Sequence, residues 1–162
     1  MIAANSNAAD VRAHGADYDE YVTVLVADQM FGLPIDRVHD VFIASAVTAV
    51  PLSQREIIGL LNLRGRVVTA MCLRRRLGIE DRKDTDREMA VGLEQKNESY
   101  GLLVDAVGEV MKLSPDTREP NPVHMDERWA KLSRGVHRLD DKLLIILDVD
   151  AVLSLGTDAR AA

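Results

Sequence analysis

The chain begins its regular pattern with a predicted β-hairpin. Apolar and β-branched residues dominate Tyr21 to Ala27, Asp28-Gln29 favours a turn, and the apolar pattern resumes from Met30 to Ile35. A further strand is expected between Val38 and Val47. The flanking residues 1–17 and 156–162 lack such a pattern, and we expect them to be tails, the first of them disordered.

A second hairpin is predicted around Arg64-Gly65. Apolar runs at Gly59–Leu63 and Arg66–Cys72 flank this dipeptide, and a glycine in second place tolerates the positive φ that a two-residue turn requires. Leu73–Leu77 followed by Gly78 is typical of a short helix with a glycine stop. The first half of the chain is therefore read as strands that end in one helical turn.

The same order of elements is predicted again after the charged segment 80–88, which we expect to be a linker. A polar turn separates the first pair of apolar runs, Asp140-Asp141 separates the second pair, and a short helix follows Asp148, whose carboxylate caps it. The runs are Met89–Leu93, Tyr100–Val110, Val136–Leu139 and Leu143–Leu147.

The chain also resembles itself in sequence. Phe31–Val41 and Tyr100–Val110 share, in register, an aromatic, Gly, Leu, a branched aliphatic, Asp, Val, an acid and Val. A second block aligns Gly59–Leu77 with Gly135–Leu153. Strands this short favour curling into small closed barrels, which removes exposed edges. We therefore expect a mainly β protein with two subdomains, about 18–80 and 88–155, that share a buried junction.

Composition narrows the class of protein. The net charge of −6 and the aromatic content of 4% argue against a nucleic-acid-binding barrel, which needs basic residues and stacking platforms. The single Cys72 indicates a reducing compartment, and no apolar run is long and uncharged enough to cross a bilayer. A cytoplasmic protein without membrane insertion is expected. Positive charge is concentrated in five arginines, which are either a solvated helix face or a patch that meets acidic side chains of a partner: Arg64, Arg66, Arg74, Arg75 and Arg76.

No set of side chains has the spacing of a catalytic or metal site. The four histidines have no His or Cys partner at ligand spacing, and Asp148 with Asp150 lacks the further oxygens of a calcium loop. Cys72 has apolar neighbours, which indicates an inert core thiol. We expect no enzyme activity, no cofactor and no metal. A small barrel hydrolase, the rival from the enzyme class, would need a clustered nucleophile or metal set.

The segment Gly59–Val68, with its Asn-Leu-Arg-Gly turn, closely resembles the CheW family of bacterial chemotaxis coupling proteins. The resemblance extends over Tyr21 to Leu155 and includes Phe31-Gly32-Leu33, Val38–Val41 and Gly101–Asp105. It implies a tandem of two five-stranded, SH3-like β-barrels with short helices and no catalysis. It also implies two partners, the cytoplasmic helical tip of a chemoreceptor and the regulatory domain of the histidine kinase CheA. A scaffold for a receptor–kinase pathway outside chemotaxis remains the alternative.

Site residues follow from the resemblance, position by position. Receptor binding is assigned to Val38, Asp40, Gly59, Asn62, Arg64, Gly65 and Val110, and kinase binding to Met89 and Val91. Arg64 either presents its guanidinium to a partner or braces its own turn or the junction. Some of Val38, Val104, Val107 and Val110 either line a groove for an apolar helix or belong to the core. Thr69 and Cys72 depart from the family pattern, which has Pro and Asp there.

Overall fold

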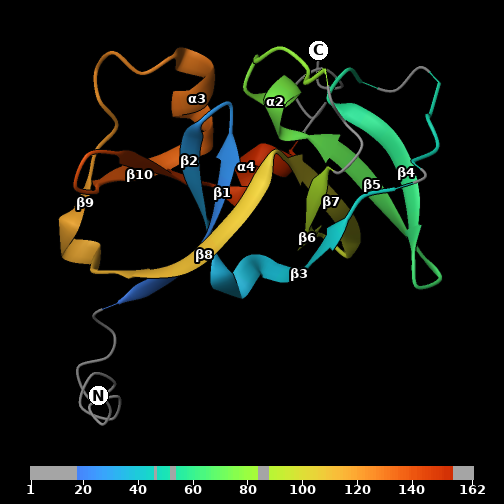
Figure 1. Cartoon of the computed structure of the whole chain (residues 1–162), viewed down its shortest axis with the longest axis horizontal. Coiled ribbons are helices and arrows are strands. Elements are labelled where there is room, and N and C mark those ends of the chain that lie inside the picture. Colours follow the sequence, from blue (N-terminus) through green and yellow to red (C-terminus); the bar gives the residue numbers. More distant parts are fainter. Residues whose placement is uncertain (1–17, 46, 52–53, 84–87, 155–162) are drawn as a thin grey trace, which may run out of the picture.

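The structure is a computed structural model that describes residues 18–45, 47–51, 54–83 and 88–154 (Figure 1). The tails expected at 1–17 and 156–162 lie outside these residues. As predicted, the fold is mainly β, with short helices. The helical segments are the 3₁₀ turns η2 (Ile35–Arg37) and η3 (Pro115–Thr117) and the α-helices α2 (Leu73–Arg76), α3 (Glu127–Leu132) and α4 (Val149–Leu153).

The strands form two sheets. The first sheet has the order β8-β1-β2-β11-β10-β9, and the second has the order β3-β6-β7-β5-β4. The first contains β1 (Asp19–Val26), β2 (Gln29–Pro34), β8 (Ala106–Leu113), β9 (Arg118–Glu119), β10 (Ser133–Arg138) and β11 (Leu143–Leu147). The second contains β3 (Val38–Ile43), β4 (Ile57–Leu63), β5 (Arg66–Cys72), β6 (Met89–Gln95) and β7 (Glu98–Val104).

The two sheets do not coincide with the two halves of the sequence. We call residues 19–77 the first copy and residues 89–153 the second copy. The first hairpin of each copy, β1–β2 or β6–β7, lies in the sheet built by the remaining strands of the other copy. In Figure 1 the blue hairpin therefore lies among the yellow to red strands of the second copy. The boundary expected at 80–88 separates the copies in sequence but not the sheets in space.

The two exchanged hairpins pair with the other copy in the same way, with matching residues opposite each other. In the first sheet β2 runs parallel to β11, with Phe31 opposite Ile145. In the second sheet β7 runs parallel to β5, with Tyr100 opposite Thr69. These pairs occupy matching places in the sequence repeat. The internal repeat found in the sequence is therefore also a structural repeat.

In each sheet, the first and last strands in the strand order are connected by a short stretch of chain. β8 and β9, at opposite ends of the first sheet, are separated only by η3 and its flanks. In the second sheet, β3 is first, and the chain that follows it reaches the last strand, where Thr48 and Leu60 exchange backbone hydrogen bonds of 2.7 and 2.8 Å. This order is compatible with the two small barrels expected, in which no long edge is left unpaired.

Tight turns at the hairpins have the conformations that the sequence indicated. Arg64 and Gly65 have φ values of 54° and 84°, and both central residues of a type I′ turn require positive φ. The first hairpin turns at Ala27-Asp28, with φ of 51° and 68°, one residue earlier than predicted. The reason is that Val26 pairs with Gln29, which leaves Ala27 and Asp28 as the loop. The helix α3 was not predicted from the sequence.

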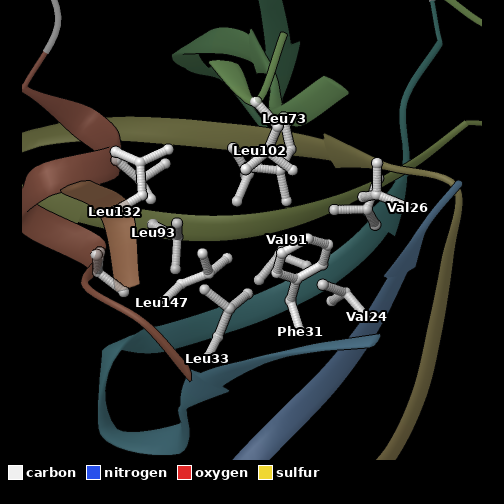
Figure 2. Packing of buried hydrophobic residues seen from close by; sticks show 14 of the residues in the cluster. Val24, Val26, Phe31, Leu33, Leu73, Val91, Leu93, Leu102, Leu132 and Leu147 are labelled. Carbon is white, nitrogen blue, oxygen red and sulfur yellow. The ribbon is translucent and has the colours of Figure 1, made fainter. Parts of the chain in front are cut away.

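One large core lies between the sheets and confirms the expected shared junction. Side chains from both sheets and from the helices pack together in it, and those of Phe31 and Leu33 from β2 and Val91 and Leu102 from the second sheet are fully buried (Figure 2). Phe31 also packs edge-to-face against Trp129, with ring centroids 5.6 Å apart. The exchanged hairpins thus bring their apolar faces into a single interior.

Two ion pairs bridge the copies at matching corners, with opposite polarity. Arg74 of α2 binds Asp105, which lies between β7 and β8, with N–O distances of 2.6 and 2.8 Å. At the equivalent corner, Arg37 of η2 binds Asp150 of α4 at 2.8 Å. Burial alone would raise the pKa of Asp105, but the hydrogen bonds from Arg74 and from the Ala27 N–H lower it below its usual value.

The arginine run Arg74–Arg76 is therefore neither a solvated face nor a free patch. Arg75 pairs with Asp81 at 2.8 Å, and Arg76 donates to the carbonyls of Ala151 and Val152 at 2.9 Å. These guanidinium groups hold α2 against its surroundings, because each is directed at an acceptor within the fold.

His137 is a buried titratable group in the first sheet. Its side chain is 2% exposed, its Nδ1 lies 3.1 Å from the Thr117 hydroxyl, and its Nε2 has no hydrogen-bond partner among the described residues. Tyr21 packs beside the ring, with centroids 6.1 Å apart. Burial, and then the charge of Arg118, lowers the pKa of His137 below 6.5, although Asp19 and Glu119 act in the other direction.

We predict that acid destabilises the fold through this histidine. The unfolded chain binds a proton near pH 6.5 and the folded chain binds it only at lower pH, so stability is full above pH 6.5 and falls as the pH decreases below it. Urea unfolding at about pH 7.5 and about pH 5.5 should show that His137→Gln loses about 1 kcal/mol less than the parent between these two values. Equal losses in both proteins would contradict the prediction.

Candidate partner-binding surface

The tip of the β4–β5 hairpin presents one unpaired cation. Arg64 is exposed, and its guanidinium makes no hydrogen bond or ion pair with any described residue. The turn is braced instead by Asn62, whose Oδ1 accepts a hydrogen bond of 2.8 Å from the Gly65 N–H. Asn62, and not Arg64, therefore braces the turn. The guanidinium of Arg64 is left available to a partner.

Two glycines shape this hairpin in different ways. At Gly65, with φ of 84°, an added Cβ would meet no atom within 4 Å, so glycine is needed there for the backbone conformation alone. At Gly59 an added Cβ would lie 2.1 Å from the carbonyl oxygen of Thr48, and the residue is buried. Gly59 therefore allows the close crossing of two chain segments. It cannot offer a side-chain contact to a partner.

Asp40 lies near the tip end of the same hairpin, beside the residues that flank the turn. It lines a small surface cavity together with Leu63, Arg66 and Tyr100. Gly92, opposite Asp40 in the sheet, makes room for the carboxylate, because a Cβ there would lie 2.0 Å from its Oδ1. The structure thus brings Asp40 together with the ends of β4 and β5, as a binding site containing both Asp40 and Arg64 requires.

Apolar side chains are exposed on the same sheet, and the sequence pattern had placed them in apolar runs without indicating which face of the strand they occupy. Val67, directly opposite Asn62, is 65% exposed, and Leu60 on the same pair of strands is also exposed. On β3, Val41 and Ile43 point outward. Strand alternation was the signal that could have identified them, since it places every second residue of an apolar run on the outer face.

The proposed valine groove is only partly present. Val104 is buried in the core, and Val38 and Val107 are partly buried against it, as the core alternative predicted. Val110 is 48% exposed, but it lies on β8 in the first sheet, where it pairs with Val22. Val110 therefore stands apart from the Arg64 hairpin, on the other sheet.

The two residues assigned to kinase contact differ in accessibility. Val91 is 0% exposed and belongs to the central core, so its side chain cannot contact a partner in this conformation. Met89, at the start of β6, is partly buried. Both side chains lie on the same face of β6, but Met89 is the first residue of the strand, whereas Val91 lies in its centre, where four consecutive residues are buried. Only Met89 of this pair keeps a surface that a partner could contact.

Cys72 lies in the core, where burial raises the pKa of its thiol, as expected for an inert cysteine. Within the described residues, no group of three or more His, Cys, Asp or Glu side chains could hold a metal ion. None of the helices in the described part of the chain is long and apolar enough to cross a bilayer. At the β4–β5 hairpin, the described surface combines the free guanidinium of Arg64 with the exposed side chains of Val67 and Leu60.

Comparison with known proteins gives a consistent result. Residues 20–156 match the model of the CheW-like domain. The chain is 27% identical over 143 residues to a probable chemotaxis protein CheW of Rhizobium etli, covering 88% of this chain and 92% of that protein. It is 27% identical over 134 residues to the chemotaxis protein CheW of Thermotoga maritima, covering 83% and 87%.

A solved structure is also similar. The scaffolding protein TtCheW from Thermoanaerobacter tengcongensis superposes with a TM-score of 0.75 at 30% identity, covering 85% of this chain and 89% of that one. The family match spans nearly the whole described fold, including both copies and their exchanged hairpins. This chain belongs to the CheW-like family.

Proposed function

We propose that this chain is a non-catalytic chemotaxis adaptor that couples the cytoplasmic tips of membrane chemoreceptors to the histidine kinase CheA and supports its receptor-controlled activity. The observation that carries the proposal is the unpaired Arg64 guanidinium at the tip of a hairpin whose turn is braced by Asn62. Relatives bearing the name chemotaxis protein CheW, and a neighbour described as a scaffolding protein, support the same role.

The receptor-binding surface combines charge with apolar area. A guanidinium offers a rigid fork of donors that suits a carboxylate or the carbonyls at the end of a helix. Val67 and Leu60, exposed on the same hairpin, provide the apolar contact that one face of a helix requires. The proposed partner is the helical tip of a receptor, so the guanidinium and the apolar side chains would contact the same helix. The proposed contact residues on this surface are Val38, Asp40, Asn62, Arg64 and Gly65, with Gly59 acting through the backbone. Val110, on the other sheet, is proposed as a separate receptor contact.

The kinase is proposed to bind elsewhere, around Met89 at the start of β6. That strand begins next to the end of β3, since Ile43 pairs with Met89 and the Ala44 N–H donates to the Glu88 carbonyl at 2.9 Å. The hairpin tip lies at the far end of β4 and β5. An adaptor needs two separate surfaces, because both partners must be held at once.

The protein is proposed to act in the cytoplasm and to join receptor arrays at the membrane through its partners. A second function remains within the same class: coupling a receptor to a kinase in a pathway other than chemotaxis. The Arg64 surface would serve either pathway, and the identity of the receptor that it binds decides between them.

The first test replaces the cation. Arg64→Ala should weaken binding to a receptor cytoplasmic fragment about tenfold, because one charge-assisted contact is lost, and should leave the melting temperature unchanged. Arg134→Ala is the matched control, since Arg134 is exposed on β10 of the other sheet and its loss changes the net charge equally. Calorimetry and a thermal melt measure both effects. Unchanged receptor affinity in Arg64→Ala would remove Arg64 from the site.

The second test asks whether both partners bind together. We expect that a receptor fragment, CheA and this chain, mixed and separated by gel filtration, elute as one complex, and that CheA autophosphorylation responds to the receptor only when this chain is present. Displacement of one partner by the other at equilibrium would contradict the two-surface arrangement. Co-elution without any effect on kinase activity would favour the alternative pathway.

A further inference from the structure

The buried side chain of His137 is held in one tautomer by a short chain of hydrogen bonds. The Thr117 hydroxyl has a single hydrogen, and it donates that hydrogen to the Ser114 carbonyl at 2.9 Å. The same hydroxyl oxygen lies 3.1 Å from Nδ1 of His137, so it serves this nitrogen as an acceptor. Nδ1 therefore carries the hydrogen of the neutral ring, and Nε2 carries the lone pair.

Nε2 is therefore the atom of His137 that takes up a proton in acid. It is buried and has no hydrogen-bond partner among the described residues. In the neutral ring this position leaves only a lone pair without a partner. Protonation would place a charged N–H donor there without an acceptor, which is far more costly in a buried site. The closed structure thus accommodates the neutral ring and not the imidazolium.

The charged groups around the ring do not remove this cost. Burial has the largest effect and lowers the pKa of His137 below 6.5, and Arg118 of β9 acts in the same direction. Asp19 of β1 and Glu119 of β9 favour the protonated ring, but with a smaller effect. Neither carboxylate forms an ion pair with the histidine, and Glu119 binds Arg138 instead, at 3.0 Å.

The elements around His137 differ in how easily they can be displaced. Its partner on β11, Leu144, is fully buried, and the ring of Tyr21 on β1 is also buried. Burial raises the pKa of the Tyr21 hydroxyl, so this neighbour is uncharged near neutral pH. Residues 114–119, which form η3 and β9, include no buried residue, and β9 pairs with β10 through two residues. This segment is therefore the part that can open without loss of core packing.

We propose that protonation of His137 at Nε2 releases the segment 114–119 from the edge of the first sheet. The charged ring then reaches water, and the Thr117 hydroxyl moves away with the segment. β10 becomes the open edge of the sheet, with unpaired backbone groups where Val136 and His137 had faced β9. The hairpin β1–β2 and β11 stay paired, so the release is local and does not require the core to unfold.

The test is amide hydrogen exchange, followed by NMR from about pH 7.5 to about pH 5 and expressed as protection factors, which remove the intrinsic effect of pH. Below pH 6.5 the protection of the amides between β9 and β10 should fall by up to about tenfold per pH unit, because opening is coupled to one proton. The amides between β5 and β7, in the second sheet, should keep their protection. Nitrogen chemical shifts of the imidazole should show Nδ1 protonated at about pH 7.5.

Three variants separate the proposal from a general effect of acid. His137→Gln should make the protection between β9 and β10 independent of pH, whereas His39→Gln, which removes an exposed histidine of the second sheet, should keep the dependence of the parent. Thr117→Val should abolish the preference of the ring for the Nδ1-protonated tautomer.

The measurements on the parent chain do not depend on any variant folding. Protection between β9 and β10 that does not change with pH would overturn the proposal. So would an equal fall in His137→Gln, a parallel loss of protection in both sheets, or a ring protonated at Nε2 at neutral pH.

Discussion

The structure depends on the burial of two hairpins in each other's sheets. Each copy supplies apolar strands that it cannot cover alone, and the other copy covers them. Phe31 of β2 and Leu102 of β7 reach the same interior from opposite hairpins, although they are far apart in sequence. Removing either hairpin would open the core of both sheets, so the two copies form one cooperative unit. The ion pairs Arg74–Asp105 and Arg37–Asp150 fasten that unit at its two equivalent corners.

Local patterns in the sequence were sufficient to predict most elements. Alternation located the strands, and Arg64-Gly65 identified a turn that has the positive φ values expected. The repeat between Phe31–Val41 and Tyr100–Val110 also proved structural, since matching residues hold matching places in the two sheets. These features are either local in the chain or visible when one segment of the sequence is compared with another, so a single sequence contains them.

The pairing of strands between copies was not predictable in the same way. A hairpin has the same alternation whether it joins its own copy or the other one, so the sequence does not show that strands from both sides of 80–88 share each sheet. The exposure of individual strand residues was also not predictable from the sequence. Val91 and Val67 are both valines in apolar runs, yet one is in the core and the other is largely exposed. Only the register decides which face each occupies, and the register depends on partners far away in the chain.

The crossing of the first hairpin into the second copy has a consequence for synthesis on the ribosome. β2 finds its parallel neighbour only when β11 has been made, and Met30 and Leu144 are 114 positions apart. At ordinary elongation rates of about 5–20 residues per second, the finished hairpin waits for several seconds with its apolar face uncovered. During that interval the apolar face of the hairpin stays accessible, so the order of synthesis leaves the first copy incomplete until the last strands of the second copy have been made.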